Sequence, residues 1–560
     1  QYYVLEESLS VSAGETKQAI LCVPVTYDTG TVTVEFRGDD GRLYAAKDVN
    51  LRADHNSQEI YVAVISSDVG QLAAFDRMML NEYRGTTTRL FDFKEDTLPV
   101  DADVLKLYDI FLWDDVDPQQ ISEEQLAALN SWIYEGGVLI AGSDSHWRQD
   151  VEVMDILREG WGRGQYVYCG FPLREASLKY PGEDGIRKFL YDCVGEARMA
   201  VIEENMDDTY GDYWSASNMT SGVDAARIPQ VWQYGVVLIV YLILLGPVLY
   251  YVLKKKKRRN LLRGAMVGLA VVFTGIIYIM GSRTRFYRPF VNYAAIREIR
   301  SGLMVETVYA NVSSPSNGAY LLDVAPGYDV SPLISYDYSH GSGQSGSSCR
   351  LRVKESAEGV RVWIYEGIPF TREMLCLTGT GSSPYDDGFE GEITLFEDGF
   401  EGILRNDSDH AFENVCLLSG GRVAVIGNME AGAEVDLSQL ETRLIYGQDQ
   451  NELLEEMAGT DHYKSPGESC EASEAVWKYR VMSDYFRNRM LDERGEAVIL
   501  AFPVVENAPY LMTEEVDVQG TTLVTETIPL NYKKNGQLYQ PMEESGIHVL
   551  QGSYQFTRNS

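Results

Sequence analysis

The chain has 560 residues, 45% of them hydrophobic, and a formal net charge of −35. This length predicts several domains, because single hydrophobic cores rarely grow beyond roughly 250–300 residues. The acidic balance argues against nucleic acid as a partner, since phosphate contacts need clustered Lys and Arg. The first residue is Gln rather than Met, from which we expect a processed N-terminus with a cleaved secretory signal.

Residues 1–56 alternate between apolar and polar side chains in the manner of β-strands. The stretch TVTVEFRGDDGRLYAAKDV, from Thr31 to Val49, reads as a hairpin that turns around GDDG. We therefore predict a small N-terminal β-sandwich over 1–56.

The hydrophobic pattern changes from Ile60 onward, where short apolar strands alternate with helical stretches. The strand-like runs are IYVAVIS, DIFLWDD, VLIAG and QYVYCGF, and a capping box at Ser122 to Gln125 starts a helix between the second and third. Alternation of this kind predicts a parallel sheet with helices on its faces. We assign an α/β domain to 57–225.

Polar side chains follow two of these strands, at the edge where parallel sheets bind ligands. They are Asp114, Asp115 and Asp117 after one strand, and Ser143, Asp144, Ser145 and His146 after the other. We predict ligand binding by the four aspartates. Ser143 or Ser145 with His146 and Asp114 could also form a hydrolase triad, although GSDSH lacks the GxSxG elbow and adjacent Ser and His residues seldom pair. Turn and helix-cap roles are the other interpretation.

Two apolar runs, 231–253 and 261–281, are each long enough to cross a bilayer as a helix, which needs roughly 20 residues. Two such runs around a basic cluster make buried core helices a poor alternative. Gly246-Pro247 should kink the first helix. Neither span contains Asp, Glu or His, so the hairpin by itself is not expected to form a transport or proton path.

The loop at 254–260 carries the basic cluster KKKKRR. Its members are Lys254, Lys255, Lys256, Lys257, Arg258 and Arg259. Short cytoplasmic loops concentrate Lys and Arg, so we expect this loop inside the cell and both flanking domains outside. Nuclear localisation or nucleic-acid binding, the usual interpretations of such a cluster, fit poorly beside an apolar span.

We predict that residues 282–560 form an extracytoplasmic β-rich region with helical patches at 439–457 and 472–491. The pentapeptide DGFEG occurs twice, which suggests calcium binding through Asp387, Glu390, Asp398 and Glu401, but the spacing of a calcium loop is missing and acidic hairpin turns are favoured. The histidines are dispersed and the seven cysteines contain no CxxC pair, so we expect no metal site and no cofactor.

The stretch from AVISSD through DIFLWDD to VLIAGS resembles the class I glutamine-amidotransferase-like, flavodoxin-like domain of membrane proteins from Gram-positive bacteria. In that family the domain is followed by a segment similar to IPQVWQYGVVLIVYLILLGPVLYYVLKKKKRR. The resemblance covers about residues 57–300. Active amidotransferases have a Cys nucleophile and a later His-x-Glu. Here Gly142-Ser143-Asp144 stands near the place of the nucleophile, and no His occurs between His146 and His340. The resemblance implies a degenerate fold without the enzyme chemistry.

These observations predict a non-catalytic, membrane-anchored envelope protein that binds or scaffolds partners. Its partners would be the lipid bilayer and an integral-membrane protein, with an ABC-type transporter as the suggested complex. Small residues in the second span permit close helix approach: Gly264, Ala265, Gly268, Ala270 and Gly275. They could serve such a partner or the packing of the two spans on each other. An envelope hydrolase using Ser143, His146 and Asp114 is the alternative function.

Overall fold

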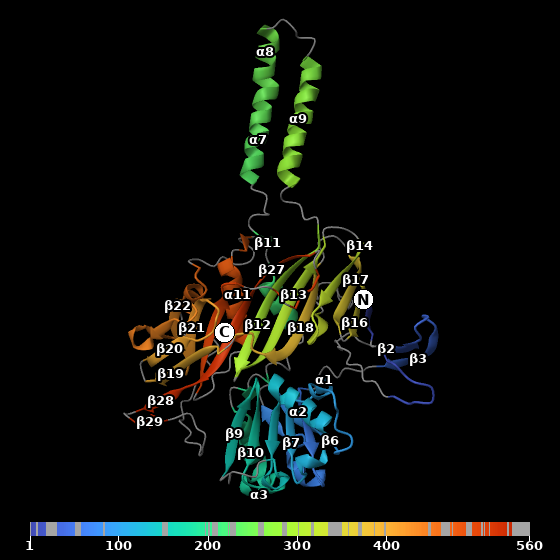
Figure 1. Ribbon diagram of the computed structural model, residues 1–560, viewed down its shortest axis with the longest axis vertical. Coiled ribbons are helices and arrows are strands. Elements are labelled where there is room, and N and C mark those ends of the chain that lie inside the picture. The colour runs from blue at the N-terminus through green and yellow to red at the C-terminus, as the bar shows by residue number, and fades with distance from the viewer. Residues whose placement is uncertain are drawn as a thin grey trace.

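The structure is a computed structural model with a helical hairpin at one end, layered β-sheets in the middle and an α/β domain at the other end (Figure 1). It describes residues 2–6, 9–17, 31–50, 58–81, 85–147, 155–195, 198–199, 202–203, 211–221, 223–224, 231–255, 262–282, 288–300, 302–314, 318–333, 350–356, 358–367, 372–385, 387–396, 399–445, 450–460, 471–472, 474–488, 496–505, 508, 510–513, 516–534 and 537–539.

The hairpin consists of helices α7 (Val231–Ile243) and α8 (Leu249–Lys255), joined by the π-helical turn η6 (Leu244–Val248), and of helix α9 (Leu262–Ser282). Pro247 lies inside η6, where the wider turn accommodates its missing N–H. Among the described residues, two helical segments are long and apolar enough to span a membrane, Trp232–Lys255 and Arg263–Met280. The two predicted spans therefore exist as apolar helices.

The α/β sheet has the strand order β5-β6-β4-β7-β8-β10-β9, and β6, β4, β7, β8 and β10 run parallel. Its strands are β4 (Glu59–Ile65), β5 (Met79–Asn81), β6 (Thr86–Phe93), β7 (Ile110–Trp113), β8 (Val138–Ala141), β9 (Ile156–Trp161) and β10 (Gly164–Cys169). Its helices are η1 (Val69–Phe75), α1 (Ala102–Leu105), η2 (Pro118–Gln120), α2 (Glu123–Glu135), η3 (Ser143–Ser145), η4 (Leu173–Glu175), α3 (Ala176–Lys179) and α4 (Gly182–Val194). The predicted parallel sheet is confirmed.

Strands β7 and β8 are buried along their whole length because helices pack on both faces of the sheet. One core lies on the side of α4 and contains Phe189 and Leu190, and the other lies on the side of α2 and contains Leu129 and Ile133. The predicted capping box also forms: the Ser122 hydroxyl accepts a hydrogen bond from the backbone N–H of Gln125 at 3.1 Å.

A large central sheet forms the middle of the molecule, in the order β15-β18-β13-β12-β27-β26-β21-β22-β24. Its strands are β12 (Phe290–Arg300), β13 (Leu303–Ser313), β15 (Tyr328–Leu333), β18 (Glu373–Ser382), β21 (Phe412–Ser419), β22 (Arg422–Met429), β24 (Thr442–Leu444), β26 (Glu496–Pro503) and β27 (Asp517–Pro529). Helices α6 (Gly211–Met219), α10 (Gln450–Met457) and α11 (Glu474–Asn488) cover one face. Short strands β11 (Val223–Asp224) and β25 (Glu471–Ala472) pair beside them.

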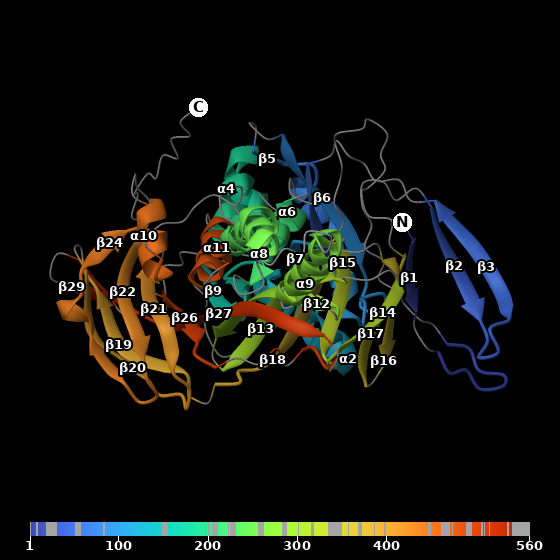
Figure 2. The ribbon, with the colours of Figure 1, turned by 90° about the horizontal axis from the view of Figure 1, so that it is seen from above.

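Two smaller sheets cover the opposite face of the central sheet, and Figure 2 shows them on either side of the helical hairpin when the molecule is seen from above. The β16 sheet contains β1 (Tyr2–Glu6), β16 (Arg350–Ser356), β17 (Gly359–Gly367) and β14 (Gly318–Val324). The β19 sheet contains β23 (Glu434–Asp436), β20 (Phe400–Asn406), β19 (Phe389–Leu395), β28 (Asn531–Lys534) and β29 (Gln537–Tyr539), with η9 (Leu437–Gln439) beside it. This β-rich region fits the prediction for 282–560.

Strand alternation explains how one sheet serves three cores. On β13, Val308 and Ala310 point toward the β16 sheet while Tyr309 points toward the helices. On β12, Ala295 belongs to the core under the β16 sheet and Ile299 to the core under the β19 sheet. The residue of β12 that lies between Ala295 and Ile299 on this face of the sheet is therefore at the boundary between the two cores.

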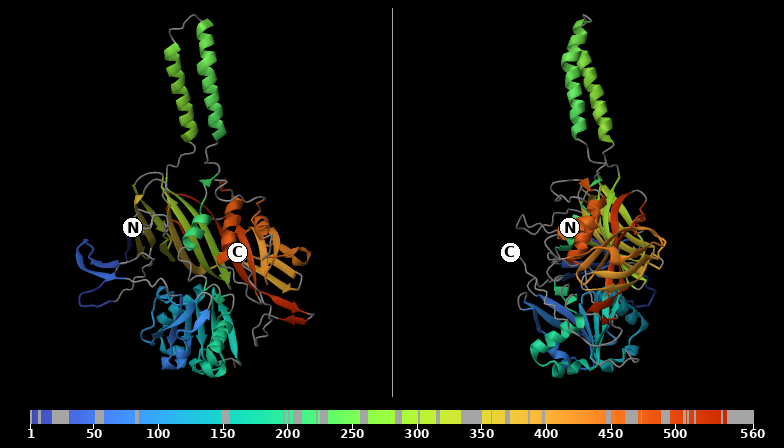
Figure 3. Two further views of the ribbon diagram at one scale, coloured as in Figure 1. Left: turned by 180° about the vertical axis from the view of Figure 1, so that it is seen from behind. Right: turned by 90° about the vertical axis from the view of Figure 1, so that its left-hand side faces the viewer.

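The N-terminal segment differs from the predicted sandwich at 1–56. In its described part, β1 joins the β16 sheet by parallel pairing with β16, while β2 (Thr31–Arg37) and β3 (Leu43–Asn50) form a hairpin that projects from the side (Figure 3). The pairing of β1 depends on a strand more than half the chain away, which no local pattern reveals.

The predicted α/β domain at 57–225 also ends too late. Helix α6 packs on the central sheet through Ala216 and Met219, and Asn292 of β12 donates to the carbonyl of Thr220. This segment therefore belongs with the β-rich region, because its apolar side chains fill the core beneath α11.

Candidate functional site

The carboxyl ends of β4, β7, β8 and β10 meet at one edge of the α/β sheet, which we call the carboxyl edge. Asp114 and Asp115 follow β7, the segment from Gly142 to His146 follows β8, and Leu173 and Arg174 follow β10 by a short turn. These segments carry the polar side chains that the sequence singled out.

Asp114 is the buried centre of this edge. Its Oδ1 accepts from the backbone N–H of Leu173 at 2.8 Å, and its Oδ2 lies 3.3 Å from Nη1 of Arg174. Burial raises the pKa of Asp114 to about 6; the Leu173 N–H and the Arg174 guanidinium oppose this rise, and the neighbouring Asp144 adds to it. The carboxyl group thus holds the turn after β10 in place.

Asp144 joins the same group through a cation that the sequence interpretation missed. Nη1 of Arg174 lies 2.5 Å from Oδ2 of Asp144, so one guanidinium bridges the aspartates that follow β7 and β8. The available signal was a basic residue just past a third predicted strand, at an edge otherwise rich in carboxylates.

Gly142 permits this arrangement by lacking a side chain. A Cβ at this position would lie 2.5 Å from Oδ1 of Asp114 and 3.1 Å from the backbone nitrogen of Leu173. Such a contact is shorter than van der Waals packing allows. The strand-end glycine is therefore needed for Asp114 to reach the turn after β10.

The other two predicted ligand-binding aspartates do not join Asp114 and make other contacts among the described residues. Asp115 has a φ of 49° and accepts from the Ser67 N–H at 2.8 Å, as well as from the hydroxyls of Ser66 and Ser67. Asp117 caps η2 by accepting from the N–H of Gln119 at 2.9 Å. The structure thus brings together Asp114 and Asp144, whereas Asp115 is bound to the segment that follows β4 and Asp117 to the start of η2.

The alternative hydrolase residues lie next to one another without forming a relay among the described residues. The buried Ser145 hydroxyl donates to the Gly142 carbonyl at 2.5 Å. Ser143 is exposed, and His146 is exposed with a left-handed φ of 56°. Neither serine has a hydrogen bond to the His146 ring in this part of the chain, and Asp114 is bound to the turn after β10, so the geometry serves the turn rather than an activated hydroxyl.

The remaining sequence candidates are also dispersed. The DGFEG repeats begin β19 and β20, where Glu390 pairs with Arg405 and Glu401 pairs with Thr394 at different levels of the hairpin; Asp398 lies outside the described residues. In the described part of the chain no group of three or more His, Cys, Asp and Glu side chains is placed to hold a metal ion.

The basic cluster is only partly described. Lys254 and Lys255 end helix α8 and are exposed. The other members lie outside the described residues: Lys256, Lys257, Arg258 and Arg259.

A family model described as a domain of unknown function (DUF8725) matches residues 388–531, from the start of β19 to the start of β28. No curated protein matches the sequence. Among solved structures, the Fcho1 mu homology domain of Danio rerio with a bound Eps15 peptide is 8% identical with a TM-score of 0.21, covering 43% of this chain and 96% of that one. The yeast delta-COP-I mu-homology domain, complexed with a Dsl1 WxWxV peptide, is 7% identical with a TM-score of 0.19, covering 44% and 98%. At these TM-scores the two structures carry no argument about this chain.

Proposed function

We propose that this chain is a membrane-anchored scaffold of the cell envelope. It would display its α/β domain at a fixed distance from the bilayer and bind an integral-membrane partner through the helical hairpin. The observation that carries this proposal is strand β12, which starts at Phe290 shortly after α9 ends and contacts the α/β domain at its far end.

Two side chains near the far end of β12 hold the α/β domain. Oε2 of Glu298 lies 3.0 Å from Nε of Arg163, and Nη1 of Arg300 donates to the Gly162 carbonyl at 3.2 Å. Arg300 also pairs with Glu496 of β26. A Cβ at Gly160 of β9 would lie 2.5 Å from the Arg300 guanidinium, so only a glycine at this position leaves room for the arginine. One continuous strand thus links the segment after α9 to the α/β domain.

The hairpin offers a surface for a partner within the bilayer. Side chains such as Val267, Val271 and Ile279 are more than 60% exposed. The α7 and α9 contact uses Tyr241 and Phe273, whose ring centroids are 5.2 Å apart. The three glycines of α9 do not take part in this contact: a Cβ at Gly264, Gly268 or Gly275 would meet nothing within 4 Å. These glycines therefore leave part of the α9 surface without protruding side chains, where another helix could approach closely. The suggested partner is the permease of an ABC-type transporter.

Purification in mild detergent tests the docking. Gly268→Leu combined with Gly275→Leu should release the co-purifying membrane protein while the outer domains keep their melting temperature. Val240→Leu, an exposed position on α7 rather than on the glycine face of α9, is the matched control and should retain the partner. Purification of this chain alone, with no effect of the glycine variants, would contradict the scaffold proposal.

Sidedness is tested by cysteine labelling of cells lacking a wall. With the basic loop inside, an impermeant maleimide should label Asp40→Cys and Glu95→Cys but label Asn260→Cys only after the membrane is opened. Labelling of all three in intact cells would overturn the topology.

A further inference from the structure

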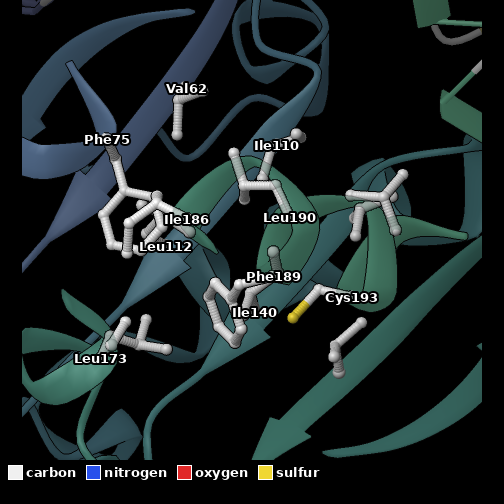
Figure 4. Close-up of a cluster of buried hydrophobic side chains, with 14 of the residues drawn as sticks. Val62, Phe75, Ile110, Leu112, Ile140, Leu173, Ile186, Phe189, Leu190 and Cys193 are labelled. Atoms are coloured by element: carbon white, nitrogen blue, oxygen red, sulfur yellow. The ribbon is translucent and has the colours of Figure 1, made fainter. Parts of the chain in front are cut away.

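Two free cysteines lie in the same core of the α/β domain. Cys169 is the last residue of β10 and is 2% exposed; Cys193 lies in the last turn of α4 and is fully buried. Both belong to the cluster between the sheet and α4, and Figure 4 shows the Cys193 side chain within it beside Ile140 and Phe189.

The register of β10 directs Cys169 toward α4. Gln165, Val167 and Cys169 alternate onto one face of the strand and are all buried. The side-chain amide of Gln165 donates to the carbonyls of Cys193 at 3.1 Å and Val194 at 2.9 Å, which fastens the end of α4 to this strand. Burial raises the pKa of the Cys193 thiol well above its usual range, and its hydrogen bond with the Cys169 thiol raises it further. The two sulfur atoms are therefore neighbours.

We propose that Cys169 and Cys193 are a disulfide-forming pair, oxidised by thiol–disulfide exchange with an external disulfide. The thiolate of one cysteine attacks the external disulfide, giving a mixed disulfide and releasing one thiol. The second cysteine loses its proton and attacks the protein sulfur, which closes the Cys169–Cys193 bond and releases the second thiol. The presence of such an oxidant in the cell rests on the proposed extracytoplasmic position of the domain.

The Cys169–Cys193 disulfide would stabilise the candidate site at the carboxyl edge. The segment 170–192, which it would close into a loop, contains Leu173 and Arg174, the residues that bind Asp114. A disulfide restricts the unfolded chain across that loop and so stabilises the folded arrangement. Because only the thiolate reacts, two buried thiols exchange slowly until α4 opens. Oxidation would therefore fix the turn after β10, and reduction would leave it held by non-covalent contacts alone.

The test uses the full chain in detergent with oxidised glutathione as the oxidant, at a denaturant concentration just below the unfolding transition so that α4 can open. After alkylation, peptide mapping should recover Cys169 linked to Cys193. The oxidised protein should melt roughly 5–10 °C higher than the reduced one. Cys169→Ala and Cys193→Ala should abolish that shift, whereas Cys416→Ala, which alters a buried free cysteine of the central sheet, should preserve it.

Recovery of both cysteines as alkylated thiols after this incubation would overturn the proposal, as would linkage of either one only to Cys22, Cys349 or Cys470. The oxidant is supplied in solution, so a failure here is distinct from a failure of the topology, which the cysteine-labelling experiment reports separately.

Discussion

The carboxyl edge of the α/β sheet and the interior of the central sheet both bury charged side chains, but they satisfy them differently. In the central sheet Arg297 occupies the boundary position on β12 between Ala295 and Ile299 and pairs with Glu306 of β13 at 2.6 Å. The Arg297 guanidinium also donates to the Tyr385 hydroxyl at 2.7 Å, and the Tyr328 hydroxyl donates to Glu306. We call Arg297, Glu306, Tyr328 and Tyr385 the polar seam.

The two groups differ in solvent access. The Arg297 and Glu306 side chains are 6% and 0% exposed, so the polar seam is enclosed by protein. At the carboxyl edge, Arg174 is 32% exposed and Asp144 27% exposed, around the buried Asp114. The enclosed set lies where two sandwich cores meet, whereas the partly open set is in contact with solvent.

The largest expected effect is the loss of one partner in the polar seam. Arg297→Met should lower the free energy of unfolding of the β-rich region by about 3–5 kcal/mol, because Glu306 would stay buried without its cation. The denaturation midpoint measures this. Arg405→Met, which removes an exposed pair with Glu434, is the control and should cost at most about 1 kcal/mol. Equal losses in both variants would show that the seam is no more important than a surface pair.

A second test concerns Glu526, which accepts from the Phe389 N–H at 3.0 Å on the same face of the central sheet. Burial raises its pKa from 4.5 to about 7. In the unfolded chain the group ionises at a lower pH than in the folded chain, so stability is lost as pH rises from about 4.5 to about 7. Glu526→Gln should therefore stabilise the protein by about 2–3 kcal/mol at pH 8 and by little at pH 4. Thermal melts at the two pH values measure this difference in stability. A difference that is the same at both pH values would show that this ionisation is not the cause.

A smaller effect is expected at the carboxyl edge. Arg174→Gln removes the cation beside Asp114 and Asp144, and because Arg174 is partly exposed the cost should be about 1 kcal/mol. The pKa of Asp114 is about 6, so the part of this cost that arises from Asp114 should appear above that pH and fade below it, where the carboxyl is protonated in the folded state. Melting curves between pH 4 and pH 8 test the dependence, with Arg187→Gln, which removes a pair with the exposed Asp184, as control.

The smallest effect is expected from the hydrolase candidates. Ser143→Ala and His146→Ala should leave glutamine hydrolysis at background, because neither residue takes part in a serine–histidine hydrogen bond among the described residues. Hydrolysis by the purified chain that falls in these variants would establish a catalytic role and exclude the purely structural interpretation of the carboxyl edge.

Patterns between near neighbours in the sequence predicted the elements that depend on near neighbours. The apolar runs became α7–α8 and α9, the Ser122 capping box formed, and the alternation from Ile60 produced a parallel sheet. The helical patch predicted at 472–491 corresponds to α11, whereas the patch at 439–457 contains β24 and only then α10. Hydrophobic spacing determines such elements because their hydrogen bonds or apolar faces are set within a few residues.

The partnerships between distant segments were decided by the tertiary structure. Sequence spacing placed Asp114 and Asp144 at one sheet edge, but only the packing of the turn after β10 supplied Arg174 between them. The same holds for β1 on β16, α6 on the central sheet, and Arg297 with Tyr385. Each of these contacts depends on strand order and register, and a shift of one residue would turn the same side chain to the opposite face.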